Sequence, residues 1–302
     1  KIAITGADAV TILLTGATDF DINSNTYVRG TAGLHHRIST RIDEAAAKNY
    51  ADLRTAHLND YQPKFDRVKL DFGATMPEIP TDMLVRSYRD NTYLDILYFQ
   101  YGRYLMLGSS RGMNLPNNLQ GVWNDSNNPA WQCDIHSNIN IQMNYWPAEV
   151  TNLSECHRPF LNYIATEAQR ENGSWQKVAR KEGITKGWTI NTQSNIFGYT
   201  DWNINRPANG WYCTHLWNHF VYTNDTTYLK ETAFPVMKSA CEYWFQRLKE
   251  VNGKLIAPNE WSPEQGPWED GVSYAQQLVW ELFDQTLRAA ELAEPDGTFI
   301  TE

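Results

Sequence analysis

Residues 209–250, NGWYCTHLWNHFVYTNDTTYLKETAFPVMKSACEYWFQRLKE, decide the fold class of this chain. Two stretches with apolar residues at helical spacing, 209–222 and 227–250, flank the short polar turn Thr-Asn-Asp. Two helices joined by so short a connection are typical of an antiparallel helical hairpin. The stretch therefore predicts a helical protein built from such pairs.

The same helical spacing recurs along most of the chain after residue 90. We expect about six helices there, and Pro147 should bend or end the second of them. Their ranges are 90–107, 139–156, 159–171, 209–222, 227–250 and 271–293. No strand pattern alternates with these segments, which argues against a parallel α/β sheet. Helical hairpins joined by long loops favour a toroid, and six helices would form half of a twelve-helix barrel.

The first 83 residues have a different character. Residues 2–18 contain a short β-branched apolar run that ends at Gly16 and predicts a buried strand. Residues 19–37 are polar and predict a loop, residues 38–65 have helical spacing, and the glycine and prolines of 73–83 indicate a linker. We therefore expect the end of an N-terminal β domain at 1–37, a helical linker at 38–83, and the helical domain at 84–302.

Composition excludes several classes of partner. The 302 residues are 42% hydrophobic, enough for a sizeable core, and carry a formal net charge of −9, which argues against nucleic acid and anionic membranes. No apolar run approaches the length of a membrane-spanning helix. The four cysteines form no C-x-x-C pair, so we expect buried thiols and no metal or redox cofactor.

Residues 115–155 indicate the chemistry of the ligand. They are rich in side-chain amides and indoles and poor in Lys and Arg. Amides donate and accept hydrogen bonds without charge, and indoles offer flat apolar faces. This mixture suits a neutral ligand with many hydroxyl groups, which means a sugar, whereas a phosphate would call for clustered basic side chains.

Glu264 is the first candidate for a chemical role. Pro263 and Pro267 restrict the backbone on both sides, and Trp261 and Trp268 lie nearby in the sequence. Apolar surroundings would favour the protonated carboxyl and make Glu264 a general acid. The alternative is an ordinary solvated acidic turn.

His136, Asn138 and Asn140 alternate along the sequence. In an extended segment, residues two apart lie on one face, so the three polar groups would converge on one point and grip a water or a sugar hydroxyl. The alternative is a pair of helix-capping asparagines beside a buried histidine.

Several motifs together resemble glycoside hydrolase family 95, the inverting α-L-fucosidases with some α-L-galactosidase members. They are Leu119-Gln-Gly-Val-Trp-Asn, His136-Ser-Asn-Ile-Asn, Met143-Asn-Tyr-Trp-Pro-Ala-Glu-Val-Thr-Asn-Leu-Ser-Glu, Pro207-Ala-Asn-Gly-Trp-Tyr-Cys-Thr-His-Leu-Trp-Asn-His and Ser262-Pro-Glu-Gln-Gly-Pro. The resemblance covers nearly the whole chain. It implies an N-terminal β-sandwich domain, a helical linker, an (α/α)6 barrel and a C-terminal β domain, so that this chain would hold the remnant of the first domain, the linker and about half of the barrel.

The resemblance also implies roles for single residues. Glu264 would be the general acid, Asn138 and Asn140 would hold and activate the attacking water, and His136 would contact the sugar. The aspartate that serves as base in the family has no matching segment before Glu302, so the chain resembles a fragment that lacks it. Gln193 and Trp211 are candidates for the sugar pocket.

The resemblance implies a secreted or periplasmic enzyme that acts on fucosylated oligosaccharides or polysaccharides without a metal or other cofactor. Gln193 stands where a glutamate is expected, which keeps L-galactose open as an alternative to L-fucose. Two further interpretations remain: a helical module that binds carbohydrate without hydrolysing it, and a helical scaffold whose aromatic residues only fill a core.

Overall fold

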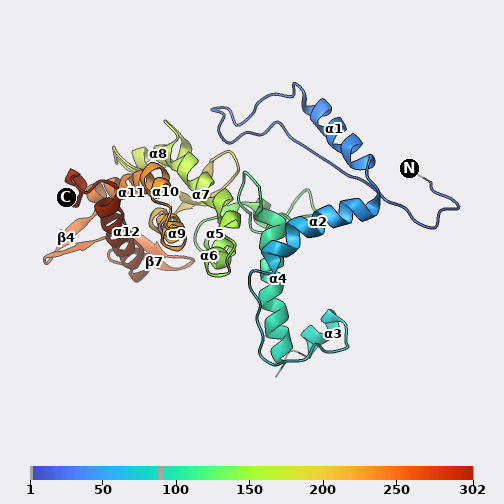
Figure 1. Ribbon diagram of the computed structural model, residues 1–302. Helices are drawn as coiled ribbons and strands as arrows, with labels where there is room; N and C mark the ends of the chain where they lie inside the picture. The colour runs from blue at the N-terminus through green and yellow to red at the C-terminus, as the bar shows by residue number, and fades with distance from the viewer. Residues whose placement is uncertain (1–2, 88–90, 302) are drawn as a thin grey trace. The chain divides into compact units, whose positions relative to one another are not determined.

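The chain is mainly helical, as the sequence predicted. The computed structural model describes residues 3–87 and 91–301 and divides the chain into two compact units, Lys1–Lys69 and Leu70–Glu302 (Figure 1). The helices of the first unit are α1 (Leu34–Ala46) and α2 (Tyr50–Phe65). The helices of the second unit are α3 (Thr81–Arg86), α4 (Thr92–Ser110), α5 (Asn140–Tyr145), α6 (Pro147–Val150), α7 (Ser154–Gln169), α8 (Ser174–Lys181), α9 (Ala208–Thr223), α10 (Thr226–Tyr228), α11 (Phe234–Arg247) and α12 (Ser273–Ala293).

Among the described residues of the second unit, three small antiparallel sheets accompany the helices. The first has the order β1 (Ile135–His136), β2 (Asn191–Ser194), β3 (Thr200–Ile204). The others are the hairpins β4 (Lys249–Val251) with β5 (Lys254–Ile256), and β6 (Glu260–Ser262) with β7 (Gln265–Glu269). The sheets are too short to form a layer of their own, and they serve to present loops.

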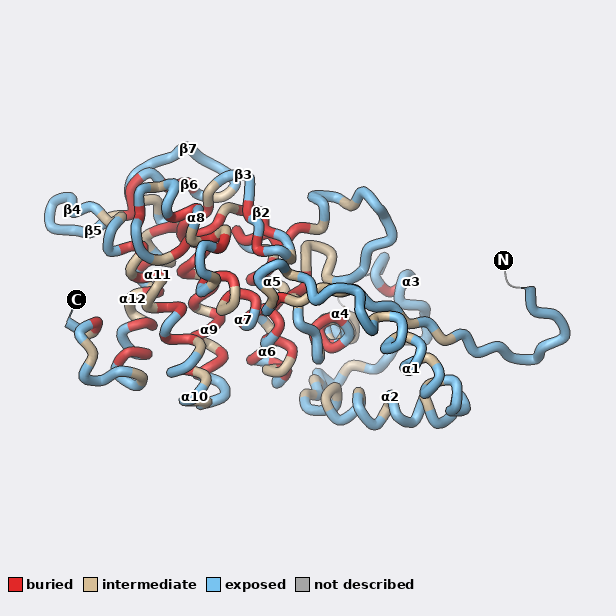
Figure 2. The backbone as a smooth tube through the Cα atoms, turned by 90° about the horizontal axis from the view of Figure 1, so that it is seen from above, coloured by how far each residue is buried: buried red, intermediate tan, exposed pale blue. Residues whose placement is uncertain are grey.

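The core of the second unit lies where α9 packs against α7, α11 and α12 (Figure 2). Each of these helices places apolar side chains three or four residues apart, so that one face is buried. On α7, for example, Cys156, Phe160 and Ile164 are fully buried. Burying one such large apolar side chain is worth roughly 1.5–3 kcal/mol.

Gly210 explains how closely α9 and α12 approach each other. A Cβ atom at this position would lie 2.9 Å from the backbone oxygen of Leu278. Any larger residue would force the two helices apart, so Gly210 fixes their distance. The N-terminal end of α9 is thereby held beside the loops that carry the candidate site.

The first unit differs from the prediction in two places. The described residues 3–18 form no strand and are mostly exposed, since no partner segment pairs with them there. The expected helix 38–65 is two helices, and Asn49 caps the second by accepting a hydrogen bond from the backbone N–H of Asp52 at 2.9 Å. The predicted domain boundaries at 37 and 83 stay predictions.

The second unit corrects three further expectations. Residues 139–156 are three helices rather than one, although Pro147 does mark a boundary, as the first residue of α6. The segment 173–207, expected to be a long polar stretch, contains α8 and two strands. The expected helix 227–250 is α10, a π-helical turn at Leu229–Ala233 and then α11, and it ends at Arg247. Short elements of this kind have too few residues to show a periodic pattern.

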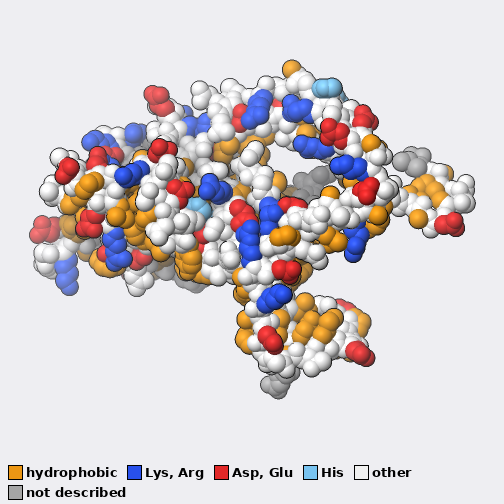
Figure 3. All heavy atoms as spheres, viewed as in Figure 1, with side chains coloured by type: hydrophobic (Ala, Val, Ile, Leu, Met, Phe, Trp, Pro, Cys, Tyr) orange, Lys and Arg blue, Asp and Glu red, His pale blue; other side chains and the backbone are white. Residues whose placement is uncertain are grey.

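The surface of the described residues carries charges of both signs. On the face shown in Figure 3, acidic and basic side chains are intermixed. Within the residues that the structure describes, no helix has both the length and the hydropathy that crossing a bilayer requires.

Candidate active site

His136 and Asn138 lie where β1 leads into α5. His136 is the second residue of β1, Asn138 lies in the following turn, and Asn140 is the first residue of α5. The expectation of one extended segment is therefore wrong, because the strand ends after His136. His136 and Asn138 are nonetheless brought together at Glu264, and both are buried.

Glu264 lies in the tight turn that joins β6 to β7. The amide Nδ2 of Asn138 donates a hydrogen bond to Oε1 of Glu264 at 2.8 Å, and Nε2 of His136 lies 3.6 Å from the same oxygen. The side chain of Glu264 is 50% exposed. The two groups beside this oxygen are polar, and they come from residues 126 and more positions earlier in the sequence.

His136 is held by a second carboxylate. Its Nδ1 atom lies 2.8 Å from Oδ2 of Asp134, an ion-pair distance in a buried setting. Burial works to lower the pKa of His136, but Asp134 and then Glu264 outweigh it, so that the pKa lies above its ordinary value. The ring therefore keeps a proton on Nδ1 and is ready to carry a second on Nε2, facing Glu264.

Asn138 offers one further group to the site. Its Oδ1 atom is buried and has no hydrogen-bond partner among the described residues. A buried amide oxygen without a partner is rare and calls for a ligand, such as the O–H of a water molecule. Asn140, two residues on, is half-buried at the start of α5.

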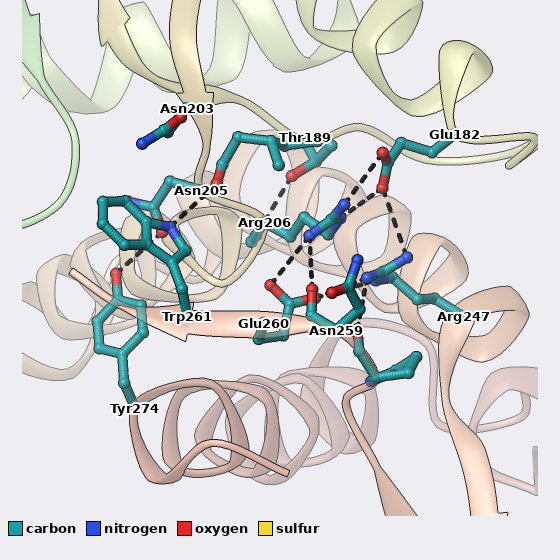
Figure 4. A network of polar contacts seen from close by, with 12 residues as sticks. Glu182, Thr189, Asn203, Asn205, Arg206, Arg247, Asn259, Glu260, Trp261 and Tyr274 are labelled. Atoms are coloured by element: carbon teal, nitrogen blue, oxygen red, sulfur yellow. Dashed lines mark hydrogen bonds and ion pairs between the residues drawn. The ribbon is translucent and has the colours of Figure 1, made fainter. Parts of the chain in front are cut away.

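The β6–β7 hairpin is fixed at its base by a buried cluster of charges (Figure 4). Glu260, on β6, is fully buried and lies 3.0 Å from Arg247 and 3.4 Å from Arg206. Both arginines also bind Glu182, which completes a four-residue network. Removing Glu260 would leave the guanidinium groups of Arg206 and Arg247 with Glu182 as their one shared carboxylate, and breaking a buried ion pair in this way typically costs about 3–5 kcal/mol.

This network connects distant parts of the chain to the hairpin. Arg206 lies just before α9, Glu182 follows α8, and Arg247 ends α11. Nη1 of Arg206 also donates to the backbone oxygen of Asn259 at 3.0 Å. No local pattern in the sequence indicates this arrangement, because its ion pairs join residues that are 13 or more positions apart.

Gln193 and Trp211 come from different elements of the same unit. Gln193, on β2, is paired in register with His136. Trp211, on the first turn of α9, makes edge contacts with Trp146 and Tyr274, each at 6.3 Å between ring centroids. The hydroxyl of Tyr274 in turn lies 3.2 Å from the side chain of Asn205, close to Trp261 (Figure 4).

A second polar cluster, which the sequence patterns did not predict, is buried between α6, α7 and α9. Oε1 of Glu149 lies 2.8 Å from Nδ1 of His157 and 2.7 Å from Nδ1 of His219. Nε2 of His157 lies 2.9 Å from Nδ1 of His215. His215 and His219 are four residues apart on one helix face, and this spacing is the only sequence signal of the cluster.

The protonation of this cluster follows from burial and hydrogen bonding. Burial works to raise the pKa of Glu149, but hydrogen bonds from His157, His219 and Ser154 lower it to about 2. Burial lowers the pKa of His157, and it lowers that of His215 well below the ordinary value. The cluster therefore holds the Glu149 carboxylate beside the neutral imidazoles of His157 and His215.

Glu149, His157 and His219 could also hold a metal ion, since their ligand atoms all lie within 4.8 Å of one another. The two contacts to Glu149 have the length of hydrogen bonds, so the carboxylate is satisfied by the two Nδ1–H groups. The absence of a metal requirement stays a prediction.

Replacing Glu149 by Gln is expected to lower the free energy of unfolding by about 2 kcal/mol near neutral pH, since a buried charged hydrogen-bond acceptor is lost. Because the folded-state pKa of Glu149 is about 2, below the ordinary 4.5, its charge stabilises the fold above about pH 4.5. This contribution is lost as the pH falls toward 2. The Glu149→Gln variant should therefore lose less stability than the parent protein over that range, as urea unfolding at a series of pH values would show.

The exposed Glu291, on α12, provides the matched control, and Glu291→Gln should leave both the stability and its pH dependence unchanged. The same unfolding curves measured with EDTA test for an ion. A clear loss of stability on chelation would show that the cluster holds a metal, contrary to expectation.

Comparison with known proteins finds similar sequences over most of the chain. The sequence pattern of the glycosyl hydrolase family 95 catalytic domain matches residues 49–302. "Probable alpha-fucosidase A" of Aspergillus niger is 36% identical over 276 residues, which cover 84% of this chain and 34% of the relative. "Alpha-L-fucosidase 2" of Arabidopsis thaliana is 33% identical over 327 residues, covering 99% of this chain and 38% of the relative. The chain thus spans about a third of the length of the curated relatives it matches.

Proposed function

We propose that this chain, which belongs to glycosyl hydrolase family 95, contributes the general acid and the water-binding amides of an exo-acting, inverting α-L-fucosidase. The observation that carries the proposal is the convergence of Glu264, His136 and Asn138, brought together from a hairpin turn and from the loop before α5. Both curated relatives described above are named as fucosidases, and the substrate of this protein is proposed by analogy with them.

Glu264 is suited to give a proton to the leaving group. Its Oε1 atom accepts the hydrogen bond from Asn138, which leaves Oε2 to carry the proton. As the glycosidic C–O bond breaks, that proton passes to the oxygen of the departing saccharide. The half-exposed position of Glu264 at the tip of a hairpin leaves this carboxyl open to a substrate.

Asn138 and Asn140 are proposed to hold the attacking water. The unpartnered Oδ1 atom of Asn138 can accept a hydrogen bond from that water and aim its oxygen at the anomeric carbon. A neutral amide cannot take the proton that the water loses, so a carboxylate behind the amides has to serve as the base. His136 would bind a sugar hydroxyl between Glu264 and Asp134.

The contact between Asn138 and Glu264 constrains how the substrate enters. In an inverting enzyme the acid and the base lie roughly 6.5–9.5 Å apart, with the sugar and the water between them. The amide and the acid are in direct contact at 2.8 Å. A pyranose that enters between them therefore has to break this hydrogen bond and form new ones with Asn138 and Glu264.

The proposal extends to the surroundings of the site. The helices from α4 to α12 are proposed to be part of an (α/α)6 barrel, with its catalytic groups on the loops at one end. Fucosylated oligosaccharides or polysaccharides are the proposed substrates, and an extracellular or periplasmic location is proposed from the resemblance to the family.

Side-by-side hydrolysis of p-nitrophenyl α-L-fucoside and p-nitrophenyl α-L-galactoside by the full-length protein tests the substrate. We expect the fucoside to be preferred by about 10-fold or more, because the two sugars differ only at C5 and one such group decides about 1–3 kcal/mol. NMR of the first product should show the inverted β anomer.

Two results would contradict the proposal. A preference for the galactoside would favour the α-L-galactosidase alternative, consistent with Gln193 beside His136. Tight binding of fucosylated saccharides without hydrolysis would favour a binding module.

A further inference from the structure

Trp202 has an unusual backbone conformation for a large aromatic residue. It lies on β3 with a φ angle of 66°, in the left-handed region that side chains other than glycine seldom adopt. On the paired strand β2, the register of the β2–β3 pairing shifts between Asn191 and Gln193. Strain of this kind is kept where the surrounding structure requires it, and it is concentrated at functional sites.

The indole of Trp202 is displayed rather than buried, since the residue is 47% exposed. Its neighbour on one side is Trp261, at 6.3 Å between ring centroids, and Trp261 in turn stacks on Trp268 at 5.6 Å. Trp261 is 7% exposed and forms the buried base of the strip, while Trp268 is 41% exposed. The three rings make a continuous aromatic strip across the β2–β3 and β6–β7 hairpins.

The strip begins beside the proposed acid. The ring of His136 lies 6.0 Å from that of Trp202, and Nε2 of His136 lies 3.6 Å from Oε1 of Glu264. Trp261 and Trp268 belong to the hairpin that carries Glu264 at its tip. The guanidinium of Arg206, 5.6 Å from the ring of Trp268, supports the outer end.

A general acid has to face the oxygen of the departing group, so the surface next to it is the place where that group lies. We infer that Trp202 and Trp268, with Trp261 beneath them, form a subsite for the leaving-group saccharide. The inference rests on the proposed function, in which Glu264 protonates the glycosidic oxygen.

The chemistry of the strip fits a neutral pyranose. The C–H face of a sugar ring can pack on an indole, and an aromatic contact is worth about 0.5–1.5 kcal/mol beyond the buried area. The hydroxyl groups of the sugar need polar partners at the edge of the strip. Asp201 and Asn203, which flank Trp202 on β3, are both exposed and can provide them. The indole N–H of Trp261 donates to the backbone oxygen of Ile204 at 3.3 Å, which fixes the base of the strip.

The test compares two substrates that share the fucosyl group and differ in the leaving group. One is an α-L-fucosyl disaccharide, and the other is α-L-fucosyl fluoride, whose leaving group is a single atom. In the full-length protein, Trp202→Ala should lower kcat/KM for the disaccharide by roughly 10-fold or more, as loss of the stacking contact implies. Hydrolysis of the fluoride should stay within about two-fold of the parent protein, because this substrate does not reach the strip.

Two further variants at the same position separate the ring from the backbone. Glycine adopts a positive φ without strain, so Trp202→Gly should fold at least as well as Trp202→Ala and show the same selective loss. Trp202→Phe keeps an aromatic face and should retain most of the activity on the disaccharide. Tyr222→Ala is the control: Tyr222 is 55% exposed but lies near the C-terminal end of α9, and neither substrate should be affected.

The outcomes separate the subsite from the proposed function. Equal losses on the two substrates in Trp202→Gly would place the ring at the fucose or in the support of the fold and would overturn the subsite. Unchanged hydrolysis of the disaccharide would overturn it as well. If the parent protein hydrolysed neither substrate, the proposed function would fail, and the leaving-group subsite with it.

Discussion

Replacing Glu264 by Gln is expected to lower kcat/KM for a fucosylated saccharide by about 100- to 10,000-fold, the usual contribution of a general acid. The amide of the Glu264→Gln variant has no acidic proton to give to the departing oxygen, although it keeps the size of the side chain and an oxygen that can accept the hydrogen bond from Asn138. An aryl fucoside with a good leaving group needs little protonation and should lose much less. Steady-state kinetics on both substrates with the full-length protein give the comparison.

A matched control lies on the same hairpin. Glu269 is an exposed residue of β7, so Glu269→Gln removes one carboxylate without touching the turn and should leave both substrates unaffected. The acid role of Glu264 would be wrong if the two substrates lost activity to the same degree. Such a result would place Glu264 in sugar binding or in support of the loop.

The helical character of the chain was predictable because long amphipathic helices repeat their pattern many times. The expected ranges 209–222 and 271–293 come close to α9 and α12 as the structure has them. The pattern failed for α5, α6 and α8, which have only four to eight residues. It also failed for residues 3–18, where β-branched residues predicted a strand but the described chain provides no pairing partner.

The candidate site was partly predictable for a different reason. His136, Asn138 and Glu264 could be chosen from residue type and resemblance, and the structure brings these three together. The local conformation was less predictable: Asn138 lies in a turn rather than a strand, and Oε1 of Glu264 meets the polar groups of Asn138 and His136. Contacts across 126 residues depend on tertiary packing, which no local pattern encodes.

The supporting networks were beyond the reach of local patterns for the same reason. Glu182, Arg206 and Arg247 belong to separate elements and are linked through Glu260 and each other. In the sequence each of these residues looks like an ordinary surface charge. The burial of Glu260 distinguishes the cluster from solvated charges. This burial raises the pKa of Glu260 although two guanidinium groups work to lower it.

Replacing Asn138 by Gly is expected to lower kcat by about 100-fold or more, while the affinity for the sugar changes little. The variant removes the buried Oδ1 acceptor proposed for the attacking water. Asn140→Gly should act in the same direction. Asn252 provides the control, because it has a φ of 51° in the β4–β5 turn, where glycine fits without strain, and Asn252→Gly should be fully active.

Asn138 has two contacts to lose, and the choice of substrate tells them apart. If its main role is to hold Glu264 through the 2.8 Å hydrogen bond, Asn138→Gly should damage hydrolysis of a disaccharide far more than hydrolysis of fucosyl fluoride. If it positions the water, both substrates lose equally, because each needs the same nucleophile whatever the leaving group. We expect the equal loss. A loss confined to the disaccharide would move Asn138 from the water to the acid and leave Asn140 as the candidate for the water site.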